Sequence, residues 1–288
     1  MSFRAKHARS ACEVEESQCL PVERFVSGRR EIPRLRAFGA SLGMTKRRYV
    51  AIAVTLAVAA PILAQGYRGW GRVATEPNVP YDGRFTFVRL RYPEVRSAGW
   101  SYDYPAMERH FMKVVKEITT IGPVVDGSNI HNLDDPELHK FPVAYLSEPG
   151  YWVMDDNEAK GLREYLLKGG FLIVDDFMGR EWYNFEEQMK RVLPGAHIVP
   201  MDVSHPIFDS FFHLKSLQMT YPNRPQIQAE FHGIFEDNDP NKRLMVIINY
   251  NNDIGDYMEW SNDDLYPVNL TNEAYKFAVN YVTYGLTH

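Results

Sequence analysis

The hydrophobic pattern of the chain alternates short, unbroken apolar runs with longer segments in which apolar residues recur every three or four positions. Runs at residues 85–90, 141–146 and 171–174 predict strands that are buried on both faces of a sheet. Residues 104–118 carry apolar side chains at helical spacing, which predicts an amphipathic helix. This alternation predicts an α/β fold with a mostly parallel sheet flanked by helices.

The segment before the third run shows both ends of a helix. Asp155 is a preferred N-cap residue, and Glu158 three positions later completes the pattern of a capping box. Gly169 follows the last apolar residues of the segment and supplies the left-handed position that commonly ends a helix. We therefore predict a helix from residue 155 to 168, followed directly by the strand at 171–174.

The remaining elements are predicted from the same kinds of pattern. The N-terminal half should also hold a short strand within 124–133, a capped helical turn at 134–138, a helix at 182–193 and a strand at 197–201. The C-terminal half should hold strands at 226–236 and 243–250, a polar loop at 249–264 and a closing helix at 272–284. Thr271 is the expected N-cap of that last helix.

Residues 44–64 have the three-part layout of a secretory signal. A basic start at Lys46, Arg47 and Arg48 precedes an apolar stretch, and small residues lead to Ala64. The apolar stretch is shorter than the roughly 20 residues of a membrane-spanning helix. We expect a cleaved signal and a periplasmic or secreted protein. A retained inner-membrane anchor and an internal helix of a soluble domain are the alternatives.

The rest of the chain divides at this segment. Residues 1–43 lack periodicity, and we expect them to be a mis-called extension of the gene, with Met44 as the true start. The alternative is a disordered cytoplasmic tail ahead of an anchor. Residues 65–83 are rich in glycine and proline and are predicted to be a linker. Residues 84–288 are predicted to form the α/β domain.

Residues 65–288 differ from the whole chain in net charge and in cysteine content. Because 11 of the 32 Lys and Arg residues and 5 of the 37 Asp and Glu residues precede residue 65, the remainder carries a net charge of −11. Such an acidic domain argues against nucleic acid and anionic membrane surfaces as partners. Both cysteines, Cys12 and Cys19, also precede residue 65, so residues 65–288 contain no disulfide and no cysteine nucleophile. The expected partner is an envelope protein or a small-molecule ligand, with membrane contact only through residues 44–64 if they stay uncleaved.

Four motifs in the domain occur in a distinctive order. They are residues 85–92, Trp100, the step from Gly169-Gly170 into Asp175-Asp176, and residues 204–208. Together they resemble the bacterial domain-of-unknown-function family 4159, over residues 84–287. The resemblance implies the fold of the class I glutamine amidotransferases, a flavodoxin-like three-layer sandwich, but no established activity.

The sequence departs from true amidotransferases at the nucleophile. Those enzymes place a cysteine at a tight strand-to-helix turn and pair it with a histidine and a glutamate. Here the strand at 171–174 leads into Asp175-Asp176-Phe177, and no cysteine follows Cys19. Thioester chemistry is therefore excluded for residues 65–288, although the fold can persist without the reaction.

Asp175 and Asp176 are the first candidate site residues, because sites in open α/β sheets form beyond the carboxyl ends of strands. Neighbouring residues of a strand point to opposite faces, so both can line one crevice only if the chain has already turned. They could ligate a hard cation, act as acid and base, bind a ligand, or cap the next helix and pair with Arg180. His205 and Asp202 follow another predicted strand, and such positions can face the same crevice, where His205 could be a base or a ligand. A purely structural turn is the alternative for both.

A second candidate group follows the strand at 141–146. Glu148, Tyr151 and Trp152 combine a carboxylate with aromatic rings, which suits a wall that binds a sugar or a peptide; simple packing is the alternative. Ser147 lacks the flanking glycines of a nucleophile elbow. The loop at 251–256 only partly matches a calcium loop, so a solvated loop is the expectation there.

These patterns identify no dedicated metal site and no cofactor. We therefore expect a non-catalytic, exported domain of the cell envelope that binds a ligand or a protein. The rival hypothesis is a cysteine-independent hydrolase that uses Asp175, Asp176 and His205, with or without a divalent cation. A structural subunit of an envelope complex is a third hypothesis.

Overall fold

The computed structural model describes residues 74–93 and 99–288. The expectations for residues 1–43 and 44–64, and for most of the linker, lie outside the described residues. Among the residues that are described, no helix has the length and apolar character needed to cross a membrane.

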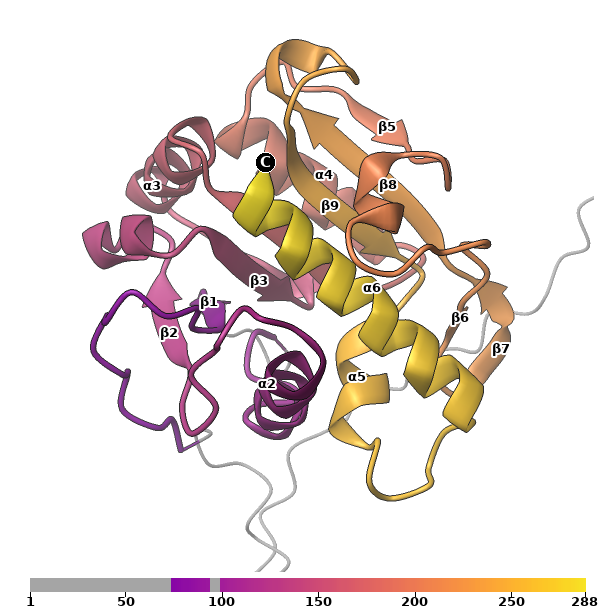
Figure 1. Ribbon diagram of the computed structural model, residues 1–288. Coiled ribbons are helices and arrows are strands. Elements are labelled where there is room, and N and C mark those ends of the chain that lie inside the picture. The colour runs from indigo at the N-terminus through magenta and orange to yellow at the C-terminus, as the bar shows by residue number, and fades with distance from the viewer. Residues whose placement is uncertain (1–73, 94–98) are drawn as a thin grey trace, which may run out of the picture. The chain divides into compact units, whose positions relative to one another are not determined.

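The domain alternates strands and helices along most of its length (Figure 1). The α-helices are α2 (Ala106–Ile118), α3 (Asp156–Leu167), α4 (Glu181–Val192), α5 (Ile254–Glu259) and α6 (Val268–Thr287). The strands are β1 (Val88–Arg91), β2 (Asn129–Asn132), β3 (Val143–Ser147), β4 (Phe171–Phe177), β5 (Ile198–Pro200), β6 (Thr220–Tyr221), β7 (Arg224–Gln228), β8 (Glu230–Phe235) and β9 (Leu244–Tyr250). Short 3₁₀ helices are η2 (Pro136–Lys140), η3 (Pro149–Tyr151), η4 (Pro206–Asp209) and η5 (Glu236–Asn238).

Seven strands form one sheet in the order β2-β1-β3-β4-β9-β8-β5, and β6 and β7 form a separate pair. The pairings of β1, β2, β3, β4 and β9 are all parallel, and β8 alone in this sheet runs in the opposite direction. The mostly parallel sheet predicted from the sequence is thereby confirmed. After β1 the chain moves to β2 on one side and then to β3 on the other. In open α/β sheets, such a reversal of strand order marks the place where ligands bind.

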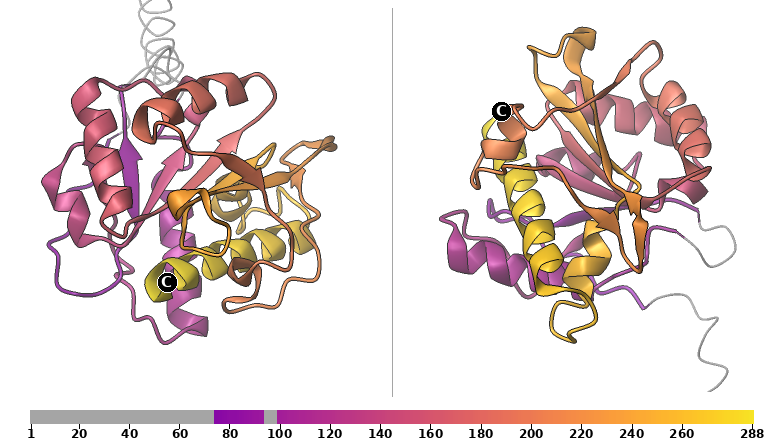
Figure 2. Two further views of the ribbon diagram at one scale, coloured as in Figure 1. Left: turned by 90° about the horizontal axis from the view of Figure 1, so that it is seen from above. Right: turned by 90° about the vertical axis from the view of Figure 1, so that its right-hand side faces the viewer.

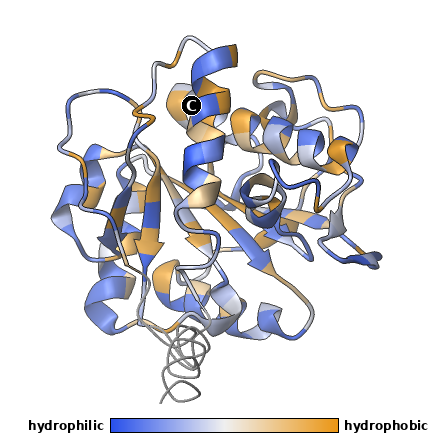
Figure 3. Cartoon of the chain, turned by 90° about the horizontal axis from the view of Figure 1, so that it is seen from below, coloured by the Kyte–Doolittle hydropathy of each residue, from blue (hydrophilic) through white to orange (hydrophobic). Residues whose placement is uncertain are grey.

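Helices cover both faces of the sheet (Figures 1 and 2). The core on one face includes residues of α2, α5 and α6, and the core on the other face includes residues of α3 and α4. The strand β4 shows the alternation that divides them: Phe171 and Ile173 belong to the first core, whereas Leu172 and Val174 belong to the second. Figure 3 shows hydrophobic positions along the strands and hydrophilic ones on the outer helix surfaces.

The predicted helix ends around α3 are confirmed. The Asp155 carboxylate accepts hydrogen bonds from the backbone N–H groups of Asn157 and Glu158, and the Glu158 carboxylate accepts one from the Asp155 N–H. Gly169 follows the helix with φ +111°, a value that favours glycine. Local sequence chemistry therefore decides where α3 begins and where the chain turns into β4.

Two expectations for the C-terminal region are wrong. The segment 249–264 is not only a polar loop, because it contains α5, whose Ile254, Tyr257 and Met258 are buried in the core. The last helix begins at Val268 after Pro267, so Thr271 lies inside α6 and is not its N-cap. A proline before the first turn starts this helix earlier than the hydrophobic pattern indicated.

The described part of the predicted linker contacts the domain. Residues 74–83 contain no helix or strand, but Asn78 donates a hydrogen bond to the Ile130 carbonyl and the Val79 N–H donates one to Asn129. These bonds attach the segment to β2, so the domain's contacts begin before residue 84.

Candidate functional site

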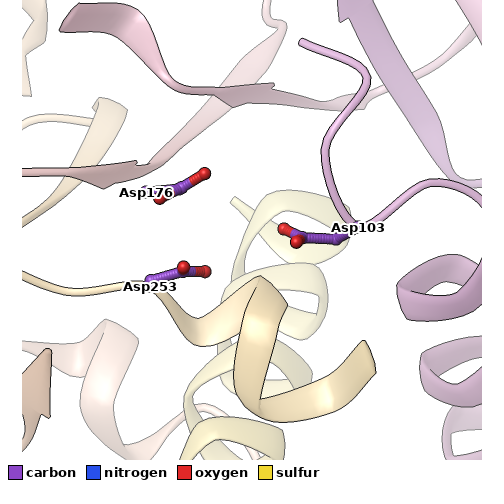
Figure 4. Close-up of side chains that lie close together, drawn as sticks. All are labelled: Asp103, Asp176 and Asp253. Atoms are coloured by element: carbon purple, nitrogen blue, oxygen red, sulfur yellow. The ribbon is translucent and has the colours of Figure 1, made fainter. Parts of the chain in front are cut away.

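Acidic side chains from three separate segments meet where β1, β3, β4 and β9 end, an edge of the sheet that we call the carboxyl edge. Asp103 follows β1, Asp176 lies near the end of β4, and Asp253 follows β9. One carboxylate oxygen of each lies within 4.8 Å of the others. Figure 4 shows the three side chains converging, and we call them the acidic cluster.

A bulge at the end of β4 brings Asp176 into this cluster. Strict alternation from Val174 would point Asp176 and not Phe177 into the second core, yet Phe177 is the residue buried there. Asp176 adopts φ +62°, and the pairing of β4 with β9 shifts register between Val174 and Phe177. The chain has therefore turned at Asp176. Such a turn is the condition under which two adjacent aspartates can lie at the same edge.

Asp175 has a structural role in the same edge. Its fully buried carboxylate accepts hydrogen bonds from the Tyr145 hydroxyl (2.8 Å), the Asn249 side-chain amide (3.0 Å) and the Gly255 N–H (3.0 Å). These donors belong to β3, β9 and α5. Asp175 thus ties three elements together and has few lone pairs left for a ligand.

Asp176 is fixed from other directions. Its carboxylate accepts hydrogen bonds from the Tyr221 hydroxyl (3.0 Å) and from the Ser147 hydroxyl (3.3 Å). Its N–H donates to the Asn252 carbonyl (3.2 Å), which places the following residue, Asp253, beside it. Asp253 in turn caps α5 by accepting from the Asp256 N–H (2.8 Å).

The loop that carries Asp103 is held by a buried cation. Arg89 of β1 has no exposed side-chain surface; its Nε donates to Glu108 (2.6 Å), and its guanidinium donates to the Trp100 and Tyr102 carbonyls. The Tyr102 bond fixes the residue immediately before Asp103. A second acidic group, formed by Asp103 with Asp256 and Glu259, continues from the cluster.

The electrostatics of the cluster are unfavourable when all its carboxylates are ionised. Two like charges 4 Å apart repel by about 4 kcal/mol at the effective dielectric constant of a protein surface. Burial and the charge of Asp176 raise the pKa of Asp103, Asp253 and Glu148, the last to about 9. Burial raises the pKa of Asp175 to about 7 and that of Asp176 to about 6. Protons or a cation must neutralise this edge.

Several buried polar atoms at the carboxyl edge have no hydrogen-bond partner among the residues that the structure describes. They include Oδ2 of Asp103, Oε2 of Glu148 and both side-chain amide atoms of the fully buried Asn252. A buried polar group without a partner costs about 1–3 kcal/mol. In addition, Asp103, Glu148, Asp176 and Asn251 all have positive φ values. Strained backbone and unpaired polar atoms tend to collect at functional sites.

The proposed aromatic wall after β3 is only partly present. Glu148 lies at the carboxyl edge in the turn between β3 and η3, and Tyr151 is 41% exposed beside it. Trp152 is fully buried in the second core, so its ring does not face solvent as the ring of a binding wall would. The reason is that α4 packs against η3, with Asn184 donating hydrogen bonds to the carbonyls of Pro149 and Trp152.

His205 and Asp202 do not join the site. The His205 ring lies 5.5 Å from Phe235, whose strand partner Leu244 begins β9, so it lies at the opposite, amino edge of the sheet. There it caps η4 by accepting a hydrogen bond from the Ile207 N–H. Asp202 is exposed and caps a turn through the Ser204 N–H. The chain folds back after β5, so following a strand does not bring either residue to the acidic cluster.

The sequence patterns did not identify Asp103 as a site residue, and they placed Asp253 in a loop that was expected to be solvated. Asp253 belongs to the acidic loop that only partly matched a calcium loop, and the helix it caps was not predicted. Asp103 lies just before α2 with no motif around it. A search for acidic residues after every predicted strand would have found both, because those positions share one edge.

The sequence matches the profile of the family described as "Domain of unknown function (DUF4159)" over residues 86–286. The chain belongs to this family. No curated protein matches it. The family covers the whole of the carboxyl edge, so Asp103, Asp176 and Asp253 all lie within the family domain.

Proposed function

We propose that this protein is an exported domain of the cell envelope that binds a divalent cation, with Ca²⁺ favoured, through Asp103, Asp176 and Asp253. The observation that carries the proposal is the convergence of three carboxylate oxygens within 4.8 Å of one another. Carboxylates are hard ligands that suit Ca²⁺, Mg²⁺ and Mn²⁺ and not softer metals. The proposal replaces the expectation from sequence that no dedicated metal site exists.

The chemistry of a site built from several carboxylates favours Ca²⁺ over Mg²⁺. Ca²⁺ binds oxygen at about 2.3–2.6 Å in flexible geometry and is commonly held by several carboxylates at once. Mg²⁺ binds at about 2.0–2.1 Å, demands near-ideal octahedral geometry and is usually held by only one or two carboxylates. A cation would also relieve the repulsion among the carboxylates without requiring them to be protonated.

The bound ion gives the domain a means of binding a ligand. Ca²⁺ takes six to eight oxygen ligands. Each of the three carboxylates brings one oxygen into the cluster, so the other coordination positions remain for oxygen atoms of a small molecule or of an envelope protein. We infer the flavodoxin-like, amidotransferase-like fold as the framework, which is supported by the order β2-β1-β3-β4-β9 and by helices on both faces of the sheet.

A second function, cysteine-independent hydrolysis, is favoured by one specific observation. Burial raises the pKa of Asp176 to about 6, which is close to the value that a general base needs near neutral pH. His205 lies at the amino edge, away from Asp175 and Asp176, so we leave it out of this hypothesis. A hydrolase of this kind would rely on Asp176 and the cation alone.

Calcium titration of the chelator-treated full chain tests the proposal. We expect stoichiometric binding by calorimetry and native mass spectrometry, and a rise in melting temperature, because a saturating ligand at 100 times its Kd adds about 2.7 kcal/mol of stability. Asp253→Asn retains an oxygen that can cap α5 but removes a charge, so Ca²⁺ affinity should fall at least about tenfold. Asp202→Asn, at an exposed aspartate outside the cluster, is the matched control and should bind normally.

Two results would contradict the proposed site. The first is a full chain that shows neither a Ca²⁺ adduct nor a shift in melting temperature. The second is an Asp176→Asn variant that loses stability but binds Ca²⁺ like the unaltered protein, since Asp176 would then be only structural. Export is tested separately: a periplasmic fraction without a chain that begins near Gln65 would contradict a cleaved signal.

A further inference from the structure

A cavity of about 180 Å³ lies next to the carboxyl edge, between α4, β8 and β9. Its lining consists of Gly179, Trp182, Tyr183, Glu230, His232 and Tyr250. Three of these six residues are tryptophan or tyrosine. Two more supply a carboxylate and an imidazole. The chain runs from Tyr250 through Asn251 and Asn252 to Asp253, so the cavity is a neighbour of the acidic cluster but shares none of its residues.

The aromatic lining forms a firm wall. The Trp182 ring lies 4.8 Å from Tyr250 and 4.9 Å from His232, measured between ring centroids, and it stacks on the buried Phe177. The Tyr250 hydroxyl donates a hydrogen bond to the Gly179 carbonyl, which fixes that ring against the turn before α4. Tyr183 is 68% exposed at the rim, so its ring is free to cover a bound molecule. Such a wall is in place before any ligand arrives.

The polar lining contains a group that lacks a hydrogen bond. Nε2 of His232 is buried and has no hydrogen-bond partner within residues 74–93 and 99–288, and a carboxylate oxygen of Glu230 lies 3.5 Å away. Burial lowers the pKa of His232, so the ring is neutral near neutral pH. A neutral imidazole next to a carboxylate can donate to one hydroxyl and accept from another.

We propose that this cavity binds the ring of a neutral sugar, a pyranose. The C–H face of a pyranose is apolar and fits an aromatic wall, while its hydroxyls satisfy Glu230 and the unpaired nitrogen of His232. The volume suits one ring, since it is below the roughly 300 Å³ at which pockets for drug-sized ligands begin. The inference goes beyond the proposed cation site and does not depend on it.

Two other ligand classes fit the lining less well. An anion would face Glu230, and none of the residues lining this cavity is a lysine or arginine. A quaternary ammonium ion suits aromatic faces and a carboxylate, but it has no hydroxyl or N–H group to pair with His232. The sequence led us to expect a sugar-binding wall at Glu148, Tyr151 and Trp152. The cavity offers the same chemistry on different residues.

Saturation-transfer NMR on the full chain tests the proposal, with glucose and N-acetylglucosamine as neutral probes and tetramethylammonium as the cationic one. We expect transfer to the ring protons of at least one sugar at concentrations up to about 10 mM, and none to tetramethylammonium. Tyr183→Ala should weaken sugar binding by about threefold to tenfold, because a single aromatic contact contributes that much. Tyr183 is largely exposed, so this variant should fold normally.

The matched control is Tyr81→Ala, which removes a tyrosine that is 51% exposed and packs against Phe141, outside the cavity. His232→Ala removes the unpaired nitrogen and is expected to abolish measurable transfer. Chelator should leave sugar binding unchanged within about twofold, which separates this site from the cation site. Transfer to neither sugar, transfer to tetramethylammonium alone, or equal losses in Tyr183→Ala and Tyr81→Ala would overturn the proposal.

Discussion

Two fully buried asparagines show how differently two regions of this domain are built. Asn280 of α6 donates a hydrogen bond to the Phe212 carbonyl and accepts bonds from the N–H groups of Phe211 and Phe212. In the described part of the chain, Asn252 at the carboxyl edge has no hydrogen-bond partner for either side-chain amide atom. Both side chains are equally buried, but only that of Asn280 has hydrogen-bond partners among the described residues.

The two edges of the sheet repeat this difference. At the amino edge, Arg243 donates hydrogen bonds to the carbonyls of Leu166 and Gly170, and His205 caps η4. At the carboxyl edge, carboxylates crowd together and left-handed residues accumulate. Folding stability alone does not favour such an arrangement, so the contrast indicates that the carboxyl edge serves binding and the amino edge serves stability.

Exchanging the two asparagines for alanine tests this contrast most strongly. Asn280→Ala should lower the free energy of unfolding by about 3 kcal/mol, because it leaves backbone groups of residues 211 and 212 without partners. Asn252→Ala should change it by less than about 1 kcal/mol, since losing an unpaired polar group offsets the cavity that remains. Urea unfolding of both variants gives the comparison, and equal losses would show that the two regions are equivalent.

The pH dependence of stability should report on the carboxyl edge. The pKa values of Asp175 and Asp176 are raised in the folded state to about 7 and about 6. Between the unfolded values near 4 and these folded values, the folded state therefore binds more protons, and stability falls as pH rises. We expect the chelator-treated protein to be less stable at pH 8 than at pH 5, by a few kcal/mol.

Calcium provides the control for this pH effect. At pH 8, added Ca²⁺ should restore much of the lost stability, because the ion replaces protons in neutralising the carboxylates. Thermal unfolding at the two pH values, with and without Ca²⁺, measures both effects. A chelator-treated protein that is more stable at pH 8 than at pH 5 would contradict the raised pKa values.

Two helical glycines sharpen the comparison between the edges. A Cβ atom on Gly255 would lie 2.7 Å from Oδ2 of Asp103 and 2.8 Å from the Tyr145 hydroxyl, whereas one on Gly285 would contact Val143 and Phe171 at the amino edge. Both Gly→Ala variants should lose about 1–3 kcal/mol of stability through overpacking. Only Gly255→Ala should also weaken Ca²⁺ binding in calorimetry, because it displaces Asp103; the same loss in Gly285→Ala would argue against a local effect.

The smallest effect is expected at His205. His205→Ala removes the cap of η4 and should cost about 1 kcal/mol in urea unfolding. Ca²⁺ affinity should stay unchanged, because the side chain lies at the amino edge. A large loss of Ca²⁺ binding in this variant would return His205 to the functional site, as the sequence first indicated.

Local sequence patterns determined the elements that depend on neighbouring residues. The capping box at Asp155, the turn at Gly169 and the buried strand that leads to Asp175 and Asp176 are all confirmed. Each depends on chemistry within a few residues, so a single sequence is enough to predict it. The position of Asp175 and Asp176 at the carboxyl edge follows from the same patterns.

Only the tertiary structure decided which residues accompany these two aspartates. Asp103 and Asp253 come from segments about 70 residues before and after Asp176, and strand order brings them together. The chain turns back after β5, which places His205 at the amino edge and away from the acidic cluster. The packing of α4 on η3 buries Trp152. The bulge at Asp176 is likewise decided by pairing with β9. Residues distant in sequence meet through long-range packing, which no local pattern of polar and apolar positions encodes.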